Sequence, residues 1–469
     1  MGDGFAIVLD VGKTLSKLSL WSREGQMLDR ITRPNAPSQG LLDTAGTAEW
    51  AIASLKRWAG QPVEYIVPVS HGAAVAGVRA DALGFRLPDY EAELAPHDLA
   101  AYRQQRDPFT LTGSPALPAG LNLGAQLHGL ELRAGDSFSR SALMPYAQYW
   151  AWLLTGVARS EVTSLGCHSD LWCPATSDFS PMARRRGWAA QFAPLAKAGD
   201  VVGRLKPELA HETGLPATTK VLAGLHDSNA ALLAARGFPE IADSEATVLS
   251  TGTWFIAMRL AKETLDLTSL PEARDCLVNV DAFGQPVPSA RFMGGREIES
   301  LIEIDTRRVD IKPDQPHLLA AVEGVLAAQA MVLPTLAPGN GPFPHGAGGW
   351  VNHPVDWYAR RAGACLYAAL VADVSLDLIG SKDCLLVEGR FAEAEVFVRA
   401  LAALRPHTRV YTANAHNDVS FGALRLIDPA LAPDGELQRV DPLPHDLAPY
   451  KAAWHARVAA QQNNREGTA

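Results

Sequence analysis

The stretch FAIVLDVGKTLSKLSLW, residues 5–21, decides how the chain begins to fold. Residues 5–9 are apolar and typical of a buried strand, while residues 10–14 are mostly polar and contain a glycine. Residues 18–21 are largely apolar again, so the pattern predicts two strands joined by a short turn. In a dinucleotide-binding fold the first strand would instead lead through its glycine-rich turn into a helix. The stretch therefore predicts a β-hairpin.

The residues that follow alternate between helical and extended patterns. Apolar residues at helical spacing predict an amphipathic helix, and they are Ala48, Ala51, Ile52, Leu55 and Ala59. Residues 65–69 form the next predicted strand, and Ser70, His71 and Gly72 form the turn that ends it. Strands that alternate with helices indicate an α/β layer architecture.

The opening pattern recurs near the middle of the chain. Residues 247–249 predict a short strand, the letters STGT at residues 250–253 a polar turn, and residues 254–258 a second strand. One such pattern in each half indicates a duplicated domain, because the period of a solenoid is far shorter. At 469 residues the chain also exceeds the roughly 250–300 residues that one hydrophobic core serves. We expect an N-terminal domain over residues 1–238, a C-terminal domain over residues 239–430 and an extension over residues 431–469.

Composition and charge argue against several classes of protein. Hydrophobic residues make up 47% of the chain and charged residues 20%, as in an ordinary globular enzyme. The net charge of −9 argues against a nucleic-acid partner, because phosphate backbones recruit proteins with a basic excess. The N-terminus lacks a secretory pattern, and no segment approaches the roughly 20 apolar residues that span a bilayer. The five cysteines include no CxxC pair, so we expect reduced thiols in a cytoplasmic protein without a membrane partner.

The first hairpin turn carries the first candidate site. The letters GKT at residues 12–14 match the end of a P-loop, but that motif needs a glycine where Ile7 stands and a helix after the turn. Gly12 would let the backbone approach a ligand, and the Thr14 hydroxyl could donate to a phosphate oxygen. Asp10 could hold Mg²⁺ through water. An ordinary hairpin turn capped by Asp10 explains the same residues, and the pattern alone leaves both interpretations open.

Two further patterns have both a structural and a chemical interpretation. The turn at residues 250–253 offers hydroxyls and flexible backbone to a phosphate, although turns of this composition are common. Asp227 follows an apolar strand and precedes a helical run, so it is either an N-cap or a general base for a substrate hydroxyl. In either role the helix N-terminus favours its ionised form. Spacing alone favours the N-cap.

Together these segments resemble the FGGY carbohydrate kinases of the actin-like ATPase superfamily. Residues 10–17 are similar to the first phosphate motif of the family, and residues 250–253 are similar to the second. The letters GLHD at residues 224–227 are similar to the segment with the catalytic aspartate, in the His-Asp form of rhamnulokinase-like and fuculokinase-like members. Further matching landmarks are LTG at residues 154–156 with Glu161 and Ser164, and Thr112 and Gly113 followed by Asn122. The resemblance covers roughly residues 5–426.

The resemblance implies a fold and a division of roles. It implies two RNase H-like α/β domains, each a mixed five-stranded sheet with flanking helices, around a central cleft that takes sugar and ATP. Asp227 would be the catalytic general base, and Asp10 would be a metal ligand. The implied sugar contacts are Ser70, His71, Gly72 and His226. The implied nucleotide contacts are Gly12, Thr14, Lys17, Thr251, Gly252, Thr253, Gly295 and Gly389.

Two segments depart from the family pattern. The letters EGRF at residues 388–391 stand where the family has a glycine-rich turn beside the adenine, and only Gly389 matches. We expect the Arg390 guanidinium to stack on the base or to reach a phosphate. The letters PGNGP at residues 338–342 replace the Gly-Glu-Arg-x-Pro pattern of the family. These departures indicate a divergent subfamily.

The sequence thus predicts a carbohydrate kinase that uses ATP, Mg²⁺ and a small sugar. The His-Asp pair, as the resemblance implies, favours a ketose such as rhamnulose, fuculose or a ketopentose. A homodimer is the default oligomeric state. The alternative is a non-catalytic sugar- and nucleotide-binding sensor on the same fold, which the altered turn at residues 388–391 would suit. Tyr149, Trp150 and Trp152 either flank the sugar or belong to the core.

Overall fold

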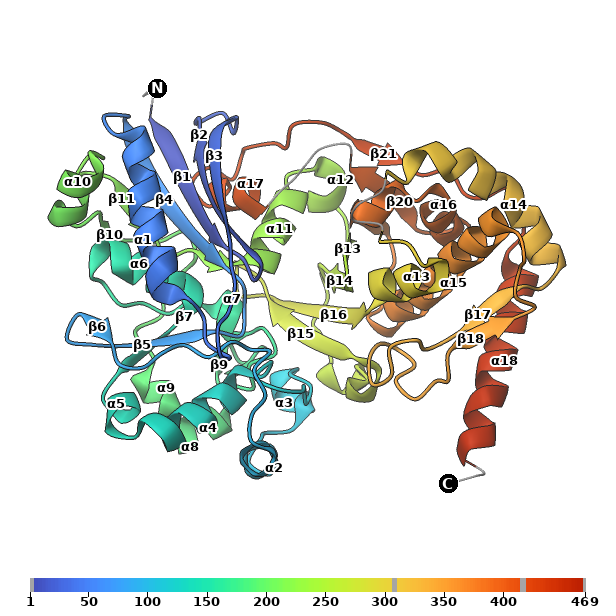
Figure 1. Cartoon of the computed structure of the whole chain (residues 1–469), viewed down its shortest axis with the longest axis horizontal. Helices are drawn as coiled ribbons and strands as arrows, with labels where there is room; N and C mark the ends of the chain where they lie inside the picture. The colour runs from blue at the N-terminus through green and yellow to red at the C-terminus, as the bar shows by residue number, and fades with distance from the viewer. Residues whose placement is uncertain (1–3, 306–309, 414–418, 467–469) are drawn as a thin grey trace. The chain divides into compact units, whose positions relative to one another are not determined.

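The protein is built from two compact units, each assembled from three stretches of sequence (Figure 1). The computed structural model describes residues 4–305, 310–413 and 419–466. Unit 1 comprises Met1–Gly237, Val278–Val287 and Asn417–Asp434. Unit 2 comprises Phe238–Leu277, Pro288–His416 and Gly435–Ala469.

Unit 1 is centred on a seven-stranded mixed sheet. Its strands, in spatial order, are β10 (Val201–Arg204), β11 (Lys220–Leu222), β4 (Val63–Ser70), β1 (Phe5–Val11), β2 (Leu15–Trp21) and β3 (Met27–Pro34), with β12 (Leu225–His226) paired to β4. The hairpin predicted over residues 5–21 is confirmed as β1 and β2, and β4 runs parallel to β1. The sheet has more than the expected five strands. The five strands were implied by the resemblance, and the additional ones are short, since β10, β11 and β12 have only 4, 3 and 2 residues.

Helices surround this sheet, and two small sheets accompany it (Figure 1). The helices are α1 (Thr44–Leu55), α2 (Pro96–Arg103), α3 (Phe109–Thr112), α4 (Leu123–Ala134), α5 (Asp136–Ser139), α6 (Tyr146–Thr155), α7 (Val162–Leu165), α8 (Pro181–Arg185), α9 (Trp188–Gln191), α10 (Pro207–Thr213), α11 (Asp227–Ala235) and α17 (Val419–Leu424). One small sheet contains β5 (Val75–Arg79), β6 (Ala82–Leu83) and β7 (Ala142–Pro145), and the other contains β8 (Trp172–Cys173) and β9 (Asp178–Phe179).

Alternate residues of β1 point to opposite faces of the sheet, and both faces are covered. Ile7 and Leu9 pack with buried residues of α1 and α6. Ala6 and Val8 pack with buried residues of α11 and α17. Because successive side chains of a strand alternate, Asp10 points to the same face as Ala6 and Val8, which is the face of α11. Burial on both faces explains why the strand reads as a continuous apolar run.

A second seven-stranded mixed sheet lies at the centre of unit 2. Its strands, in spatial order, are β15 (Cys276–Val280), β16 (Pro286–Phe292), β14 (Phe255–Arg259), β13 (Ala246–Thr251), β19 (Cys384–Gly389), β20 (Arg409–Ala413) and β21 (Leu437–Arg439). The hairpin predicted over residues 247–258 is confirmed as β13 and β14. β19 pairs in parallel with β13, as β4 pairs with β1. The two sheets therefore share the strand–turn–strand theme that the sequence showed.

The remaining elements complete unit 2 and the connections. The helices are α12 (Pro239–Ala242), α13 (Gly294–Ile302), α14 (Gln315–Ala327), α15 (Trp357–Leu378), α16 (Glu395–Leu404) and α18 (Ala448–Glu466), and β17 (Met331–Leu333) pairs with β18 (Gly349–Val351). The short 3₁₀ helices are η1 (Lys56–Trp58), η2 (Leu267–Ser269), η3 (Glu272–Arg274), η4 (Lys312–Asp314) and η5 (Arg390–Glu393).

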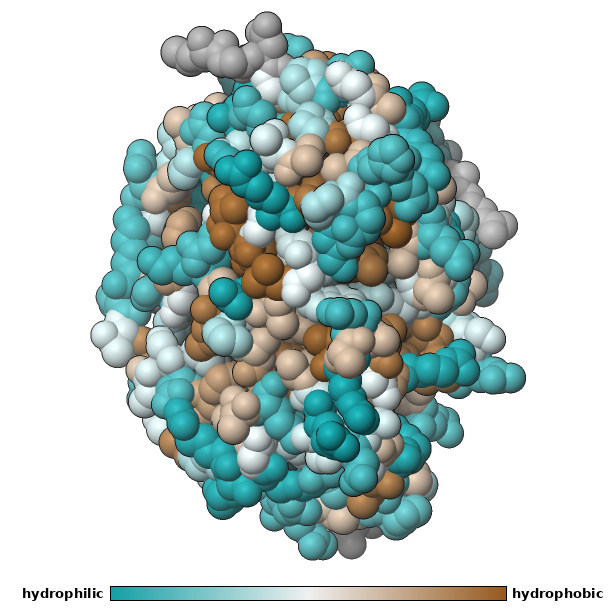
Figure 2. All heavy atoms as spheres, turned by 90° about the vertical axis from the view of Figure 1, so that its left-hand side faces the viewer, coloured by the Kyte–Doolittle hydropathy of each residue, from teal (hydrophilic) through white to brown (hydrophobic). Residues whose placement is uncertain are grey.

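The burial of aromatic side chains and cysteines bears on two expectations from the sequence. Tyr149, Trp150 and Trp152 are buried in the core that includes α6, so their role is packing. All five cysteines are buried. None of the helices in the described part of the chain combines the length and apolar composition that a bilayer crossing requires. Figure 2 shows one face of the molecule with hydrophilic side chains over much of its area and hydrophobic ones between them, as on ordinary protein surfaces.

Candidate functional site

Polar residues gather where three parallel strands of unit 1 end. Asp10 lies next to the last residue of β1, Ser70 ends β4 and His226 ends β12. Ser70 pairs with Val11 in one parallel ladder and with His226 in the other. The carboxyl ends of these strands therefore open onto one edge of the sheet, where α/β proteins commonly bind their ligands. Asp227 follows His226 directly and belongs to the same edge.

The β1–β2 turn is tightly braced. The Gly12 amide donates to the Leu15 carbonyl over 3.1 Å, and a Cβ on Gly12 would lie 2.9 Å from that oxygen. The turn therefore requires glycine. The Asn35 side chain donates to the Gly12 carbonyl over 2.7 Å, and its backbone amide donates to the Thr14 carbonyl over 2.8 Å. The side chain of Thr14 is exposed at the tip of this ordered turn.

Asp10 is a buried carboxylate with a cationic partner. Asp10 and Lys17 face each other in the β1–β2 ladder, and Lys17 Nζ lies 3.0 Å from Asp10 Oδ2. Among the described residues there is no group of three or more His, Cys, Asp or Glu side chains that could hold a metal ion. A lone carboxylate still suits Mg²⁺, which keeps several waters and takes other ligands from substrate phosphates. Asp10 therefore fits the metal role that the resemblance implies.

Asp227 begins α11, and His226 is the N-cap residue. The N-cap interpretation that spacing favoured for Asp227 is therefore wrong. His226 Nε2 lies 3.1 Å from Asp227 Oδ1, and the Ser228 amide donates to the same oxygen over 2.6 Å. Burial lowers the pKa of His226 to about 4, so its imidazole is neutral near pH 7. A neutral imidazole can donate Nε2–H to the carboxylate, which orients Asp227 without adding charge.

The protonation of Asp227 is set mainly by burial. Burial raises the pKa of Asp227, and the nearby His71, the Ser228 hydrogen bonds and Lys17 oppose that rise. In setting this pKa, desolvation therefore outweighs the helix N-terminus, which favours the ionised form and was the only effect that the sequence argument considered. Protein surrounds the carboxylate on most sides, while 28% of the side-chain surface stays exposed. A carboxylate with a raised pKa and one open side is a better proton acceptor near neutral pH.

The turn after β4 lies against His226. A Cβ on Gly72 would lie 2.7 Å from His226 Nε2, so a larger residue would displace the imidazole. His71 Nδ1 donates to the Gly72 carbonyl over 2.9 Å, and burial lowers the pKa of His71 against the opposing effect of the Asp227 charge. The centroids of the Tyr90 and Tyr146 rings lie 5.5 Å and 5.2 Å from that of His71. The edge of the sheet therefore has a wall of aromatic and imidazole side chains.

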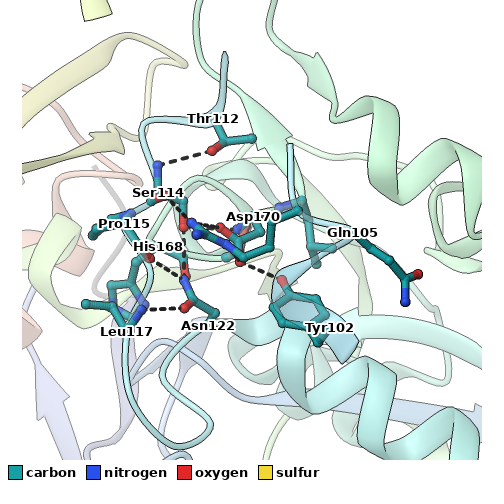
Figure 3. A network of polar contacts seen from close by, with 12 residues as sticks. Tyr102, Gln105, Thr112, Ser114, Pro115, Leu117, Asn122, His168 and Asp170 are labelled. Carbon is teal, nitrogen blue, oxygen red and sulfur yellow. Dashed lines mark hydrogen bonds and ion pairs between the residues drawn. The ribbon is translucent and has the colours of Figure 1, made fainter. Parts of the chain in front are cut away.

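A buried polar network fixes the loop at residues 113–122 (Figure 3). Asp170 accepts hydrogen bonds from Arg106 Nε and Nη2 over 2.9 Å and 3.0 Å. Figure 3 shows Asn122 bonded to several neighbours in the same network. Gly120, within this loop, donates its amide to the Tyr90 carbonyl over 2.9 Å. The Asn122 landmark thus has a structural role close to the candidate site.

Three glycine-containing segments meet in unit 2. A Cβ on Gly295, in the first turn of α13, would lie 2.0 Å from the Gly252 carbonyl oxygen. Gly389 has a φ of 84°, and a Cβ there would lie 2.4 Å from the Thr251 carbonyl oxygen. The Thr251 hydroxyl donates to the Glu388 carbonyl over 2.5 Å. The turns after β13 and β19 therefore adjoin the N-terminus of α13, whose amides and dipole favour an anion such as a phosphate.

Two ionisable side chains, Glu388 and Arg390, flank Gly389. Arg390 Nη2 lies 3.1 Å from Glu299 Oε1, and its guanidinium lies 4.9 Å from the centroid of the Phe391 ring. Burial raises the pKa of Glu388 to about 7, against the effect of a hydrogen bond from Ser250. The contact of Arg390 with a nucleotide stays a prediction.

The structure gathers the predicted site residues into one group in each unit. The group in unit 1 contains Asp10, Gly12, Thr14, Lys17, Ser70, His71, Gly72, His226 and Asp227. The group in unit 2 contains Thr251, Gly252, Thr253, Gly295, Gly389 and Arg390. That both groups bind one triphosphate stays a prediction. Sequence reasoning missed Asn35, Tyr90 and Tyr146, because each reaches the site from a distant part of the chain.

Known proteins share this fold. The family described as "Carbohydrate kinase FGGY, C-terminal domain" matches residues 243–434. A carbohydrate kinase from Novosphingobium aromaticivorans is 62% identical, with a TM-score of 0.95 over 98% of this chain and 100% of that chain. A xylulose kinase from Lactobacillus acidophilus has 14% identity and a TM-score of 0.77, covering 99% and 98% of the two chains. A Plasmodium falciparum glycerol kinase with ADP has 10% identity and a TM-score of 0.75, covering 98% and 99%. Among curated proteins, none matches the sequence.

Proposed function

The chain belongs to the FGGY carbohydrate kinase family, and from that premise we propose that Asp227 is its general base in phosphoryl transfer from Mg-ATP to a ketose hydroxyl. A carbohydrate kinase of this family is a phosphotransferase that uses ATP as its donor. The ketoses we propose are rhamnulose, fuculose and ketopentoses. A cytoplasmic location and a homodimer complete the proposal.

One observation carries the assignment of Asp227. Its carboxylate is oriented by the neutral imidazole of His226 at 3.1 Å, at the edge where the parallel strands end, and part of its surface stays open. A general base must combine a fixed orientation, access to the substrate and a pKa near the working pH. Asp227 has an oriented carboxylate, an open side and a raised pKa.

The side chains around Asp227 suggest how it would act. His226 and the Ser228 amide both hold Oδ1, so we assign Oδ2 to the proton of the sugar hydroxyl. His71 and Tyr90 would orient the sugar, since aromatic and imidazole side chains pack well against sugar rings and donate to hydroxyls. The proton moves to Asp227 as the sugar oxygen attacks, and the protein supplies mainly positioning.

The nucleotide phosphates have candidate partners in both units. In unit 1 we propose the Gly12 turn, the Thr14 hydroxyl and Lys17. In unit 2 we propose the turns at Thr251–Thr253 and at Gly389–Arg390 with the N-terminus of α13, which offers amides to an anion. Mg²⁺ held through Asp10 would offset the charge on the phosphates.

An ADP-release assay with a panel of acceptors tests the proposal. The panel should contain ketoses, aldoses and polyols, including xylulose and glycerol, because the names of the structurally similar kinases include these two compounds. We expect the highest kcat/KM with a ketose. Sugar binding without ADP release from any acceptor would instead support the sensor alternative.

Asp227→Ala isolates the general base. This variant should lower kcat by about 10²–10⁴-fold while ATP binding, measured by calorimetry, stays nearly unchanged. Asp136→Ala is a matched control, because Asp136 is also the first residue of a helix but is exposed. An Asp227→Ala variant that kept more than about a tenth of the wild-type kcat would exclude the general-base role.

A further inference from the structure

Lys13, in the β1–β2 turn, is held by three consecutive residues from a distant part of unit 1. Its Nζ is in close contact with Asp89 Oδ1 and lies 3.2 Å from Glu91 Oε2. It also lies 4.3 Å from the centroid of the Tyr90 ring, a distance at which a cation and an aromatic face attract each other. The sequence argument rejected a P-loop at Lys13 and included this residue in the segment that resembles the first phosphate motif, without giving it a role of its own.

The charges around Lys13 indicate the role open to it. Two carboxylates offset one ammonium group, and the side chains of Lys13 and Asp89 are 18% and 7% exposed. Because these carboxylates offset its charge, the ammonium group attracts an incoming phosphate only weakly. Removal of either partner would leave the other charge poorly solvated, so the contact is a strong link between two segments.

The segment that Lys13 holds is irregular, and the burial of Leu87 in the core of unit 1 anchors its middle. Residues 84–95 connect β6 to α2 and contain neither a helix nor a strand, apart from one bridge at Pro88. Backbone hydrogen bonds of 2.9 Å tie Asp89 to Gly40 and Tyr90 to Gly120. The Lys13 contacts add the link between this segment and the β1–β2 turn.

The same segment places Tyr90 beside His71, at the edge of the sheet that we propose as the acceptor site. The centroid of the Tyr90 ring lies 5.5 Å from that of His71, and burial raises the pKa of Tyr90, with smaller contributions from the charges of Glu91 and Asp227. A small hollow adjoins this wall, and its lining includes Gly12, Lys13, Asn35, Thr47, His71 and Tyr146. A shift of residues 89–91 would therefore disturb His71 and Lys13, which contact Tyr90 and line this hollow.

We propose that Lys13 is a positioning residue that locks the Tyr90 segment to the β1–β2 turn and thereby sets the affinity for the sugar acceptor. The proposal rests on the proposed function, because it takes this edge of the sheet as the acceptor site. Lys13 acts through Tyr90 and Asp89, and its role is distinct from that of Asp227, which meets the reacting hydroxyl.

Steady-state kinetics with the full chain test this role. Lys13→Met should raise the acceptor KM about tenfold, which corresponds to about 1.4 kcal/mol, with kcat and the ATP KM within about twofold of wild type. Lys13→Arg keeps the charge between the carboxylates and should recover most of the affinity. Asp89→Asn should raise the acceptor KM similarly, and the double variant should be no worse than Lys13→Met, because both changes break one link. Lys56→Met breaks the exposed ion pair with Glu212 and is the matched control.

Hydrogen exchange measures the same link without turnover. Amides in residues 84–94 should exchange faster in Lys13→Met than in wild type, and Lys56→Met should leave them unchanged. Unaltered exchange in this segment, or a loss confined to kcat, would overturn the proposal. If wild type released no ADP with any acceptor, the proposed function would fail instead, and the exchange rates would still decide whether Lys13 locks the segment.

Discussion

Glu161 allows a quantitative test of how unit 1 tolerates a buried acid. It is the N-cap residue of α7, and its Oε2 accepts hydrogen bonds from the amide of Thr163, over 3.0 Å, and from the hydroxyl of Thr163. That hydroxyl in turn accepts from the His226 amide over 2.9 Å, so Glu161 supports the strand end that leads to Asp227. Burial raises the pKa of Glu161 to about 8, although the Thr163 hydrogen bonds oppose the rise.

The sign of the pH dependence follows from the two protonation states. The unfolded chain releases the Glu161 proton near pH 4.3, whereas the folded chain keeps it until about pH 8. Between these values the folded state binds more protons, so the free energy of unfolding falls as pH rises. The slope is about 1.4 kcal/mol per pH unit, so Glu161 alone lowers stability by about 3 kcal/mol between about pH 5.5 and 7.5. Its stabilising contribution is complete at low pH and is lost once pH has passed about 8.

Glu161→Gln removes this dependence because glutamine cannot ionise and still accepts the Thr163 hydrogen bonds. Urea unfolding of both proteins across the pH range gives the difference in the free energy of unfolding at each pH. We expect the difference to shift in favour of the variant by about 1.4 kcal/mol per pH unit and to level off above about pH 8. Glu49→Gln, at an exposed position on α1, is the control and should follow wild type. A difference that stays constant from about pH 5.5 to 8 would refute the claim that Glu161 is buried as an uncharged acid.

Three further substitutions test close contacts and charge at the candidate site. Gly72→Ala puts a Cβ 2.7 Å from His226 Nε2. Overpacking of about 1–3 kcal/mol should lower kcat/KM in the ADP-release assay roughly 5- to 150-fold. An unchanged kcat/KM would mean that the imidazole can move without consequence. Gly295→Ala puts a Cβ 2.0 Å from the Gly252 carbonyl, which is backbone, so urea unfolding should show a loss of about 2–3 kcal/mol; a wild-type midpoint would contradict the close approach of α13. Arg390→Ala should raise the ATP KM about tenfold, as expected for one charge-assisted hydrogen bond; an unaltered ATP KM would show that Arg390 does not touch the nucleotide.

The parts of the fold that could be predicted are those encoded in short, continuous patterns. The apolar runs on both sides of Gly12 predicted the first hairpin, and the runs around residues 250–253 predicted the second. The strand that ends at Ser70 was also predicted, because its apolar residues are contiguous. The site residues that follow these strands could be found for the same reason, since each stands at the end of a recognisable element.

The parts that could not be predicted depend on contacts between distant segments. Lys13 and Asp89 are 76 residues apart, and nothing in either neighbourhood indicates that they meet. Burial of Asp227 by the rest of unit 1 raises its pKa, whereas its position at a helix start suggests the opposite. The sequence shows that Arg390 carries a guanidinium group, but it does not show that the ion-pair partner is Glu299, which lies on another helix. A sequence pattern records what a residue is, but burial and partners come from the assembled chain.

The position of α17 has a consequence for how the protein is synthesised. This helix comes late in the chain, yet it packs on α11 and on the sheet of unit 1, with the Phe421 ring centroid 6.5 Å from that of Trp21. A Cβ on Gly422 would lie 1.7 Å from the Ala230 carbonyl oxygen, so the contact leaves no space for a larger residue. A ribosome must therefore translate most of unit 2 before the segment that closes the core of unit 1 has emerged. A nascent or truncated chain that ends at Gly237 leaves the apolar surface under α17 open to chaperones and proteases.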